Sequence, residues 1–391
     1  MCWIHLEIEY LELKSFFMKI LQISNDFAGS KVHSNLFQHL DAQGVEQVVY
    51  CPIRDPKLFD SNKFESQCTD FIYSFIIKPW YKFLYHYKRR VLYCDMKSKV
   101  DMKSIDLIHA ATLFSDGGLA YKAYKEFQVP YVIAVRNTDI NDFAKLQPHT
   151  WASGRKILLC AQKIYFISKA LQHEFEHLKF VQPILKQIKS KMVLRPNGVE
   201  SYWLNHVTNS STMGDDILYI GDFSANKNVL KLIEAVKEIR SESAYRDLHL
   251  TIIGGGKEKG TMVSDVIQKE NFITYLGKIY DKEKISDVMR KHALFAMPSI
   301  HETFGLVYIE SLSQNLPVIF SKGQGIDQLF SDNEFPIGIG VDPKSIISIK
   351  EAILTILNNR IRYSNKQIDF TRFDWETIAA SYIKDYQSIF Y

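Results

Sequence analysis

Residues 293–320 read ALFAMPSIHETFGLVYIESLSQNLPVIF, and this stretch indicates how the chain folds. Its first five residues are apolar and Pro298 follows them, which suits a buried parallel strand that ends there. A helix is predicted to begin at residues 304–306, because apolar residues then recur at helical spacing. Glu302 lies in the intervening loop, and Glu310 lies about one and a half turns into the helix. The stretch therefore predicts an α/β fold with two carboxylates at the C-terminal end of a strand.

This junction has the chemistry to bind an elongated, phosphate-linked ligand that is rich in hydroxyl groups. The amides of a helix's first turn have no partner within the helix and can hold a phosphate. One carboxylate can face the reacting end of a substrate while the other reaches a pair of hydroxyls. The alternative is that Glu302 is a loop charge and that Glu310 lies on a solvated helix face.

Strand and helix signals alternate along the rest of the chain, as in a doubly wound α/β fold. Buried strands are expected at residues 20–24, 47–50, 105–109, 129–135 and 163–168, and then at 217–220, 248–253, 273–276 and 293–297. A turn-rich break at residues 196–199 separates the two series, and 391 residues exceed one ordinary core, so we expect two domains. Residues 1–17 precede the first strand and are interpreted as an extension outside the core, with an extra surface helix as the alternative.

Charge and cysteine content exclude several functional classes. Lys and Arg total 48 against 44 for Asp and Glu, which argues against nucleic-acid binding. The five cysteines are widely spaced and form no C-x-x-C pair, so neither a disulfide framework nor a zinc site is indicated. No apolar stretch is long enough to span a bilayer, and Glu7, Glu9 and Glu12 stand where a signal peptide would carry basic residues. We therefore expect a cytoplasmic protein.

The Glu302 stretch resembles the retaining family-4 glycosyltransferases (glycosyl transferases group 1) of the GT-B fold. Their E-x7-E signature matches Glu302 and Glu310, and their Gly/Asn-x-Pro-Val strand matches residues 315–318. The resemblance covers nearly the whole chain and implies two doubly wound Rossmann-like domains that face each other across a cleft. It assigns residues 18–198 to an N-terminal acceptor-side domain and 199–373 to a C-terminal domain that binds the nucleotide sugar. Residues 374–391 would form a helix that crosses back to the N-terminal domain.

The resemblance also implies roles for the donor-binding residues of the second domain. Glu302 would contact the transferred sugar, and Glu310 the nucleotide ribose. The backbone of Phe304, Gly305 and Leu306 would hold the diphosphate together with Lys227, which matches the family's lysine. The arginine or lysine that relatives carry after the glycine of the same loop is replaced by Asp222, so half of the expected clamp is missing. The alternative for Lys227 is a solvated lysine near a helix start.

In the first domain the resemblance points to two loops. Gly29 and Ser30 follow the first strand, where a small residue lets a phosphate or sugar approach, although Ser30 departs from the family's paired glycine. Arg136 aligns with a histidine of relatives, and Arg136, Asn137 and Asp139 would position sugar and acceptor. Asp139 is alternatively a helix N-cap. Attack would occur on the same face of the sugar, with the leaving phosphate taking the acceptor proton.

His109 and residues 323–325 are further candidates for the site. His109 ends another predicted strand and is either a structural histidine or part of the site. The Gly-Gln-Gly sequence of residues 323–325 either shapes the nucleotide pocket or is a plain turn.

The function that these similarities imply is a hexosyltransferase that moves a sugar from a UDP- or GDP-sugar to a glycan or lipid-linked acceptor. The expected setting is bacterial surface polysaccharide assembly, in exopolysaccharide, capsule or lipopolysaccharide. No cofactor and no metal are expected, because a helix N-terminus and a lysine supply positive potential and no Asp-x-Asp cluster is present. The alternatives are a GT-B phosphorylase, a nucleotide-sugar epimerase, or a sugar-binding module without catalysis.

Residues 71–93 interleave aromatic and basic side chains. Such a pattern suits peripheral contact with anionic lipid headgroups at the inner face of the cell membrane, where a lipid-linked acceptor would lie. The alternative is a helix pair that packs its aromatic residues inside the first domain.

Overall fold

The computed structural model describes residues 18–210, 214–256 and 260–390, without the side chains at 82, 83, 260 and 261. The chain divides into two compact units. Unit 1 contains the chain up to Ile167, Leu171–Asn197 and the segment from Trp375, and unit 2 contains Ser168–Ala170 and Gly198–Asp374. The first unit therefore ends one residue before the predicted boundary at 198, and the C-terminal segment belongs to unit 1. The N-terminal extension, residues 1–17, lies outside the described residues.

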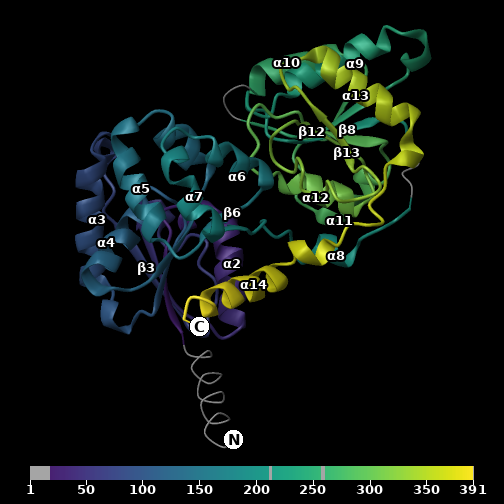
Figure 1. Cartoon of the computed structure of the whole chain (residues 1–391). Helices are drawn as coiled ribbons and strands as arrows, with labels where there is room; N and C mark the ends of the chain where they lie inside the picture. Colours follow the sequence, from purple (N-terminus) through teal and green to yellow (C-terminus); the bar gives the residue numbers. More distant parts are fainter. Residues whose placement is uncertain (1–17, 211–213, 257–259, 391) are drawn as a thin grey trace, which may run out of the picture. The chain divides into compact units, whose positions relative to one another are not determined.

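Unit 1 is built on a parallel sheet of seven described strands in the order β3-β2-β1-β4-β5-β6-β7 (Figure 1). Their bounds are β1 (Lys19–Ile23), β2 (Glu46–Ile53), β3 (Thr69–Phe75), β4 (Leu107–Ala110), β5 (Tyr131–Ala134), β6 (Ile164–Phe166) and β7 (Met192–Leu194). The helices are α2 (Lys31–Ala42), α3 (Tyr85–Lys99), α4 (Asp116–Phe127), α5 (Trp151–Cys160), α6 (Lys169–Glu176), α7 (Leu185–Ile188) and α14 (Trp375–Gln387).

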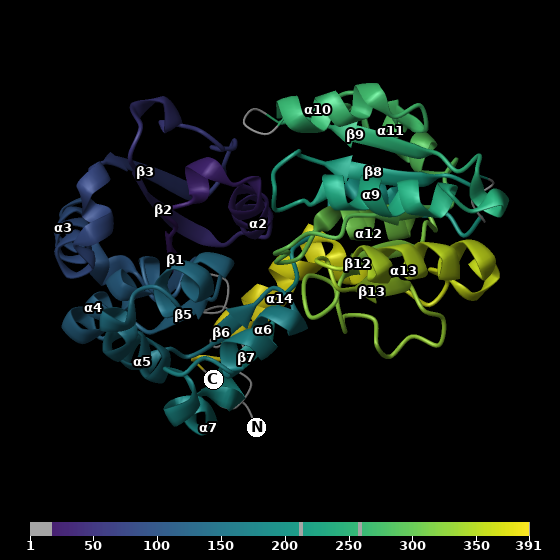
Figure 2. The same cartoon turned by 90° about the horizontal axis from the view of Figure 1, so that it is seen from above.

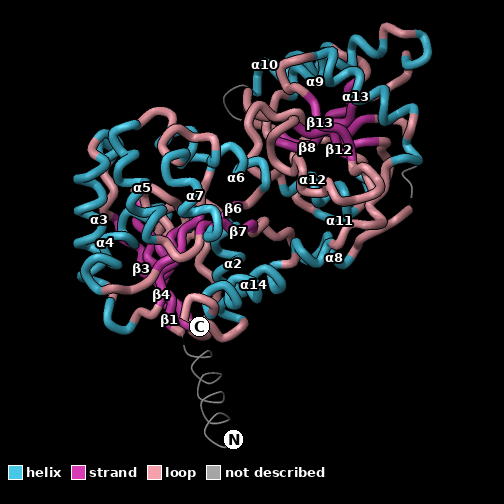
Figure 3. The backbone as a smooth tube through the Cα atoms, viewed as in Figure 1, coloured by secondary structure: helices cyan, strands magenta, loops and turns pink. Residues whose placement is uncertain are grey.

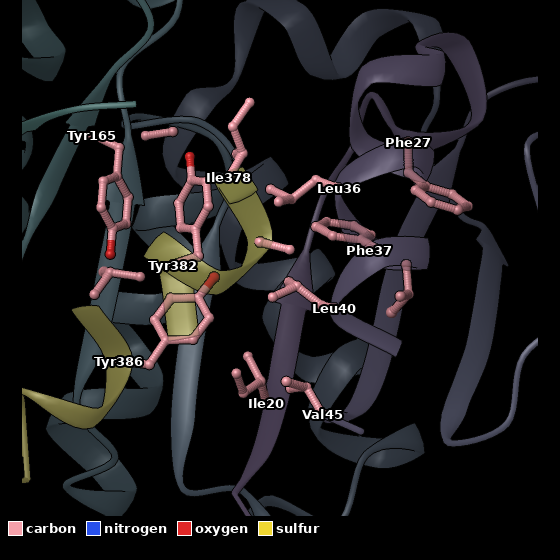
Figure 4. Close-up of a cluster of buried hydrophobic side chains, with 14 of the residues drawn as sticks. Ile20, Phe27, Leu36, Phe37, Leu40, Val45, Tyr165, Ile378, Tyr382 and Tyr386 are labelled. Carbon is pink, nitrogen blue, oxygen red and sulfur yellow. The ribbon is translucent and has the colours of Figure 1, made fainter. Parts of the chain in front are cut away.

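Helices α2 and α14 pack together on one face of this sheet and close its core. Leu36, Phe37 and Leu40 of α2 recur at helical spacing and are all buried, because they form the face turned to the sheet. From α14, Tyr382 lies edge-on to Tyr165 of β6, with ring centroids 4.7 Å apart (Figure 4). The last helix of the chain is thus part of the core of unit 1.

Unit 2 is a second parallel sheet, with six described strands in the order β10-β9-β8-β11-β12-β13 (Figure 2). The strands are β8 (Ile217–Gly221), β9 (Leu250–Gly254), β10 (Ile273–Tyr275), β11 (Leu294–Ala296), β12 (Val318–Ser321) and β13 (Gly338–Val341). The helices are α8 (Ser201–Asn205), α9 (Val229–Arg240), α10 (Gly260–Lys269), α11 (Lys282–Met289), α12 (Leu306–Ser313) and α13 (Ile346–Asn358). Helices α9 and α13 lie on one side of the sheet, and α11 and α12 on the other (Figure 3).

The strand order places a switch point in each sheet. In unit 1 the chain first runs outward from β1 to β3 and then returns to add β4 on the other side of β1. In unit 2 the same reversal puts β11 beside β8. Ligands of open α/β sheets bind beyond the carboxyl ends of the strands at such a point. The loops after β8 and β11 in unit 2, and after β1 and β4 in unit 1, are therefore the places to look for a site.

The α/β prediction with two Rossmann-like domains is confirmed, and the strands that sequence reasoning missed are all at sheet edges. These are β3, β7 and β13, each of which has one strand neighbour. Their side chains are largely half-exposed, so they lack the continuous apolar run of a central strand. The alternative that residues 71–93 form a helix pair is wrong for the first part of that segment, since Thr69–Phe75 is a strand.

Candidate active site

The centre of the unit 2 site is an ion pair between Lys227 and Glu302. The Lys227 Nζ lies 2.7 Å from the Glu302 Oε2, and the two side chains are 23% and 11% exposed. Lys227 comes from the loop after β8, and Glu302 from the loop after β11, so the pair bridges the two sides of the switch point. The lysine and the glutamate that the sequence separates by 75 residues are direct partners.

Two amide side chains hold the Glu302 loop in place. Gln324 accepts a hydrogen bond from the Glu302 amide at 2.6 Å and donates one to the Ile300 carbonyl at 2.8 Å. Asn226 brackets His301, accepting from its amide and donating to its carbonyl, both at 2.9 Å. Asn226 was not predicted as part of the site, whereas Gln324 belongs to residues 323–325, for which a pocket role and a plain turn were both left open. Two features of the sequence could have indicated these residues. Asn226 directly precedes Lys227, and Gln324 lies between the two glycines of the turn at residues 323–325.

Gly305 begins α12 and determines how closely the helix approaches Glu302. Its φ is +77°, in the left-handed region that favours glycine. A Cβ at this position would lie 2.5 Å from the Tyr308 ring and 3.3 Å from the Glu302 carboxyl carbon. Tyr308 is fixed in turn, because it is fully buried and its hydroxyl donates to the Met297 carbonyl at 2.6 Å. Glycine is therefore required here both for its dihedral angles and for space.

The first turn of α12 offers amide donors beside the ion pair. The amides of Leu306 and Val307 donate no hydrogen bond to any other described residue, as expected at a helix start. Phe304 precedes them and anchors the turn, since its side chain is 2% exposed and packs against Phe373 at 6.3 Å between ring centroids. Backbone donors and the lysine ammonium thus surround the same loop, an arrangement suited to an anion.

Glu310 lies on α12 and is partly exposed. Its carboxylate makes no hydrogen bond or ion pair with another described residue. Burial raises the pKa of Glu310 to about 7, and the charge of Lys282 opposes this rise. Lys282 is itself paired with Glu200. The Glu310 carboxylate therefore has no partner among the described residues and is available to accept hydrogen bonds from a ligand. It lies on the same helix that begins at the ion pair.

In unit 1 the two predicted loops have different roles. Gly29 closes a 3₁₀ turn after β1, and a Cβ there would lie 3.0 Å from the Asp26 Oδ1. Ser30 begins α2 with extended backbone angles, and its hydroxyl does not cap the helix. Asp26 connects the two loops electrostatically, because its pKa is raised by burial and lowered by the charge of Arg136.

Asp139 is 1% exposed and accepts three backbone hydrogen bonds. Leu113, Phe114 and Arg136 donate their amides to its carboxylate at 3.0, 3.0 and 2.9 Å. Burial nevertheless raises the pKa of Asp139 to about 6. The side chain joins the loop after β4 to the loop after β5 and does not cap its own helix, whose N-cap is Thr138. This geometry describes a residue that positions loops.

Arg136, Asn137 and His109 complete the predicted unit 1 residues. The Arg136 Nε donates to the Ala111 carbonyl at 3.2 Å, which leaves its terminal guanidinium nitrogens without a partner among the described residues. Burial lowers the pKa of Arg136. Asn137 accepts a hydrogen bond from Asn141. His109 is buried in the core, where its Nδ1 lies 2.8 Å from the Tyr386 hydroxyl, in agreement with the structural alternative.

The structure therefore brings the predicted residues together as two groups. Unit 2 gathers Lys227, Glu302 and residues 304–306, with Glu310 one turn further along the helix. Unit 1 gathers Arg136 to Asp139 in one loop and holds Gly29 and Ser30 in another. No group of three or more metal-ligating side chains occurs within residues 18–210, 214–256 and 260–390.

Two family models match the chain, one over each half. The model described as Glycosyltransferase Family 4 matches residues 30–201, and the one described as Glycosyl transferases group 1 matches residues 205–372. Curated relatives include an uncharacterized glycosyltransferase of Methanocaldococcus jannaschii, 24% identical over 75% of this chain and 78% of the relative. Another is named for teichuronic acid biosynthesis in Bacillus subtilis, 24% identical over 67% of this chain and 62% of the relative.

Solved structures share the fold at low sequence identity. Sucrose-phosphate synthase from Thermosynechococcus elongatus has a TM-score of 0.69 at 18% identity, covering 95% of this chain and 99% of that one. The lipopolysaccharide outer core galactosyltransferase WaaB has a TM-score of 0.67 at 17% identity, covering 95% and 100%. With both halves matched by glycosyltransferase models and both sheets arranged as described, the chain belongs to the glycosyltransferases of the GT-B fold.

Proposed function

We propose that this glycosyltransferase is a retaining enzyme that uses a UDP- or GDP-sugar as donor and a glycan or lipid-linked molecule as acceptor. The observation that carries the proposal is the Lys227–Glu302 ion pair beside the open first turn of α12. A nucleoside diphosphate would satisfy the lysine and the helix amides together, because both supply positive potential at one place. Its sugar would then lie next to Glu302.

The reaction that we propose breaks the bond between the sugar's anomeric carbon and the diphosphate oxygen. The acceptor hydroxyl attacks the same face, its oxygen bonds to the anomeric carbon, and its proton passes to the departing phosphate oxygen. Lys227 and the amides of α12 stabilise the charge that develops on the leaving diphosphate. Glu302 accepts hydrogen bonds from the sugar, and its loop is already held by Gln324, so little reorganisation is needed.

Residues of unit 1 would serve the acceptor side. The free guanidinium nitrogens of Arg136 and the amide of Asn137 can contact sugar or acceptor, as the sequence predicts. We assign Asp139 a positioning role, because both of its carboxylate oxygens already accept backbone amides. The role of Gly29 and Ser30 is to leave the loop after β1 open to the ligand.

A donor screen tests this proposal. UDP-, GDP- and other nucleotide sugars are added to the full chain, and the melting temperature is measured, since a ligand that binds the native state raises it. At about 100 times Kd the native state gains about 2.7 kcal/mol. The shift should shrink in Glu310→Ala and persist in Glu351→Ala, an exposed glutamate on α13. No shift with any donor would contradict the proposed donor site.

Product analysis tests the retaining outcome and the alternatives. Once an acceptor is identified, NMR should show that the transferred sugar in the product has the same anomeric configuration as in the donor. A product with the inverted configuration would refute retention. Turnover that depends on inorganic phosphate would indicate a phosphorylase, and interconversion of free nucleotide sugars an epimerase. Donor binding without turnover would favour a sugar-binding module.

The biological setting that we propose is bacterial surface polysaccharide assembly. The support is that matched proteins are named for teichuronic acid biosynthesis and for transfer to the lipopolysaccharide outer core. Acceptors in such assembly are glycans or lipid-linked saccharides, which fits the acceptor class above. Cytoplasmic localisation is part of the same proposal.

We also propose that unit 1 contacts an anionic membrane through an aromatic surface. This surface consists of Phe75, Trp80, Leu84 and Tyr87, which are 62%, 45%, 48% and 49% exposed. The exposed bases Lys78 and Arg90 adjoin it, while the side chains of Lys82 and Phe83 lie outside the described residues. Half-exposed aromatic rings beside bases suit the headgroup level of a bilayer. No helix in the described residues has both the length and the apolar character needed to cross one.

Vesicle co-sedimentation tests the membrane contact. Wild type should bind phosphatidylglycerol vesicles more tightly than phosphatidylcholine vesicles, because bases near the surface are attracted by anionic lipid. Trp80→Ser/Tyr87→Ser and Lys78→Glu/Arg90→Glu should each reduce binding. The control is Tyr280→Ser, which removes an 82% exposed aromatic side chain from unit 2. Equal binding by all variants would refute the contact.

A further inference from the structure

A pocket in unit 1 lies between α3, the first turn of α4 and the π-helix Asp139–Ala144 with the residues after it. Aromatic walls come from Tyr81, Tyr85 and Phe143. Its polar lining includes two cations, Lys88 and Arg89. The pocket is close to the carboxyl end of β4, because α4 begins only six residues after that strand. It therefore adjoins the edge of the sheet where ligands of this fold class bind.

Arg89 is held rigidly in this pocket without a carboxylate partner. Its Nη1 donates to the Ser153 hydroxyl at 2.5 Å, and its guanidinium lies 5.3 Å from the Tyr85 ring centroid. Its Nε is buried and has no hydrogen-bond partner. Gly118 on α4 makes room for it, since a Cβ there would lie 2.4 Å from the Arg89 Cδ. The glycine and the serine fix the position of a charge that no described carboxylate neutralises.

Lys88 is partly buried in the same pocket and its ammonium has no hydrogen bond or ion pair with any described residue. Burial lowers the pKa of Lys88, the charge of Asp116 raises it, and that of Arg54 lowers it again. Asp116 is already engaged by Asn25 and Thr112, at 2.9 and 3.0 Å. An ammonium withdrawn from water without a partner is costly, and an anionic ligand would offset that cost.

We propose that this pocket binds a phosphate group of the acceptor, through Lys88 and Arg89. Two adjacent cations with no carboxylate partner select an anion over a neutral sugar, and phosphate accepts charge-assisted hydrogen bonds from both lysine and arginine. The aromatic walls accommodate the apolar or sugar part attached to the phosphate. The inference rests on the proposed function, because it names the acceptor class of the same transfer reaction.

The phosphate has two chemical sources that the same pocket would accept. One is a soluble sugar phosphate, and the other is the diphosphate of a lipid-linked saccharide. Calorimetric titration of the full chain separates them with three probes: a hexose 1-phosphate, farnesyl diphosphate and farnesol. Each probe is titrated into wild type and into Lys227→Ala, so that any phosphate binding at Lys227 is recognised by its loss in the variant.

We expect at least one phosphate probe to bind and farnesol to bind far more weakly. Lys88→Ala and Lys88→Gln should each weaken that probe about tenfold or more, as loss of one charge-assisted contact does. Lys103→Ala is the matched control, because it removes an exposed charge from unit 1 outside the pocket. Melting temperatures of all variants show whether each is folded.

The inference is overturned if no phosphate probe binds, or if wild type and the folded Lys88 variants bind it equally. Preference for the hexose phosphate identifies a soluble acceptor, and preference for farnesyl diphosphate a lipid-linked one. The proposed function is tested separately by measuring donor binding. Lys227→Ala should abolish donor binding, and Lys88→Ala should leave the donor affinity unchanged. A protein that binds its donor in this way but ignores both phosphate probes retains the proposed function and loses only the acceptor inference.

Discussion

The carboxyl edges of the two sheets have the same architecture but treat their charges in opposite ways. In unit 2, Lys227 and Glu302 neutralise each other across the switch point at 2.7 Å. In unit 1, Lys88 and Arg89 lie in a pocket without a carboxylate partner among the described residues, and Asp139 accepts three backbone amides. The difference is whether a cation at the carboxyl edge of the sheet already has a carboxylate partner among the described residues.

The contrast also separates residues that act from residues that position. Glu302 is 11% exposed and its partner is the side chain of Lys227, which is itself 23% exposed and within reach of a ligand. Asp139 is 1% exposed and its partners are amides of the chain itself, which no ligand can replace. Two carboxylates at equivalent ends of strands therefore have different consequences when they are removed.

The largest expected effect is on the paired site. Lys227→Ala should lower kcat/KM about 10²- to 10³-fold, because it removes the ammonium that we propose stabilises the leaving diphosphate. Steady-state transfer assays measure this, with Lys231→Ala, a partly exposed lysine of α9, as the control. A change of less than threefold would mean that the helix amides alone hold the diphosphate.

Removing Asp139 should act on stability instead. Asp139→Ala leaves three buried amides without acceptors, and each such loss costs about 1–3 kcal/mol, so we expect a loss on the order of 3 kcal/mol or more. Urea unfolding gives the value. Nucleotide-sugar affinity of the folded fraction should stay unchanged. A stable variant that has lost turnover would return Asp139 to a catalytic role.

The pH dependence of donor binding should follow Glu310. Its pKa is raised to about 7 in the folded chain, and in the proposed function its carboxylate form accepts the ribose hydroxyls, so donor affinity should rise about tenfold between pH 6 and pH 8. The free protein should show the opposite trend. Because the pKa of Glu310 is higher in the folded chain than its ordinary value of 4.5, this group contributes its full stabilisation below pH 4.5. That contribution is lost as the pH rises through 7. Calorimetric Kd values against pH test this, and Glu310→Gln should flatten the profile.

The smallest expected effect comes from removing Gln324, whose side chain holds the Glu302 loop in place. Gln324→Ala removes two hydrogen bonds, from the Glu302 amide and to the Ile300 carbonyl, and should reduce kcat about tenfold with little change in KM. The conservative variant Gln324→Glu keeps the acceptor for the Glu302 amide and should lose less. An equal rise in KM would indicate direct ligand contact by Gln324.

Central strands and the loop that carries Glu302 were predictable, because local sequence patterns determine them. The strand at 294–296, the helix beginning at Leu306 and the placement of Glu302 between them follow from apolar spacing and Pro298. The resemblance supplied Lys227 as part of the same site. Edge strands such as β13 were missed, because half-exposed residues without a continuous apolar run give no clear period.

The sequence by itself determined the two-domain α/β class, the break near residue 198 and the residue types available at each strand end. Only the tertiary structure decided which charges are paired, since that depends on distances between loops far apart in the chain. It joined Lys227 to Glu302, turned the Gln324 amide onto the Glu302 loop, and left Lys88 without a partner in the described part of the chain. Periodicity reports which face of an element is buried, whereas the partner of a polar group is fixed only when the sheets assemble and water is excluded.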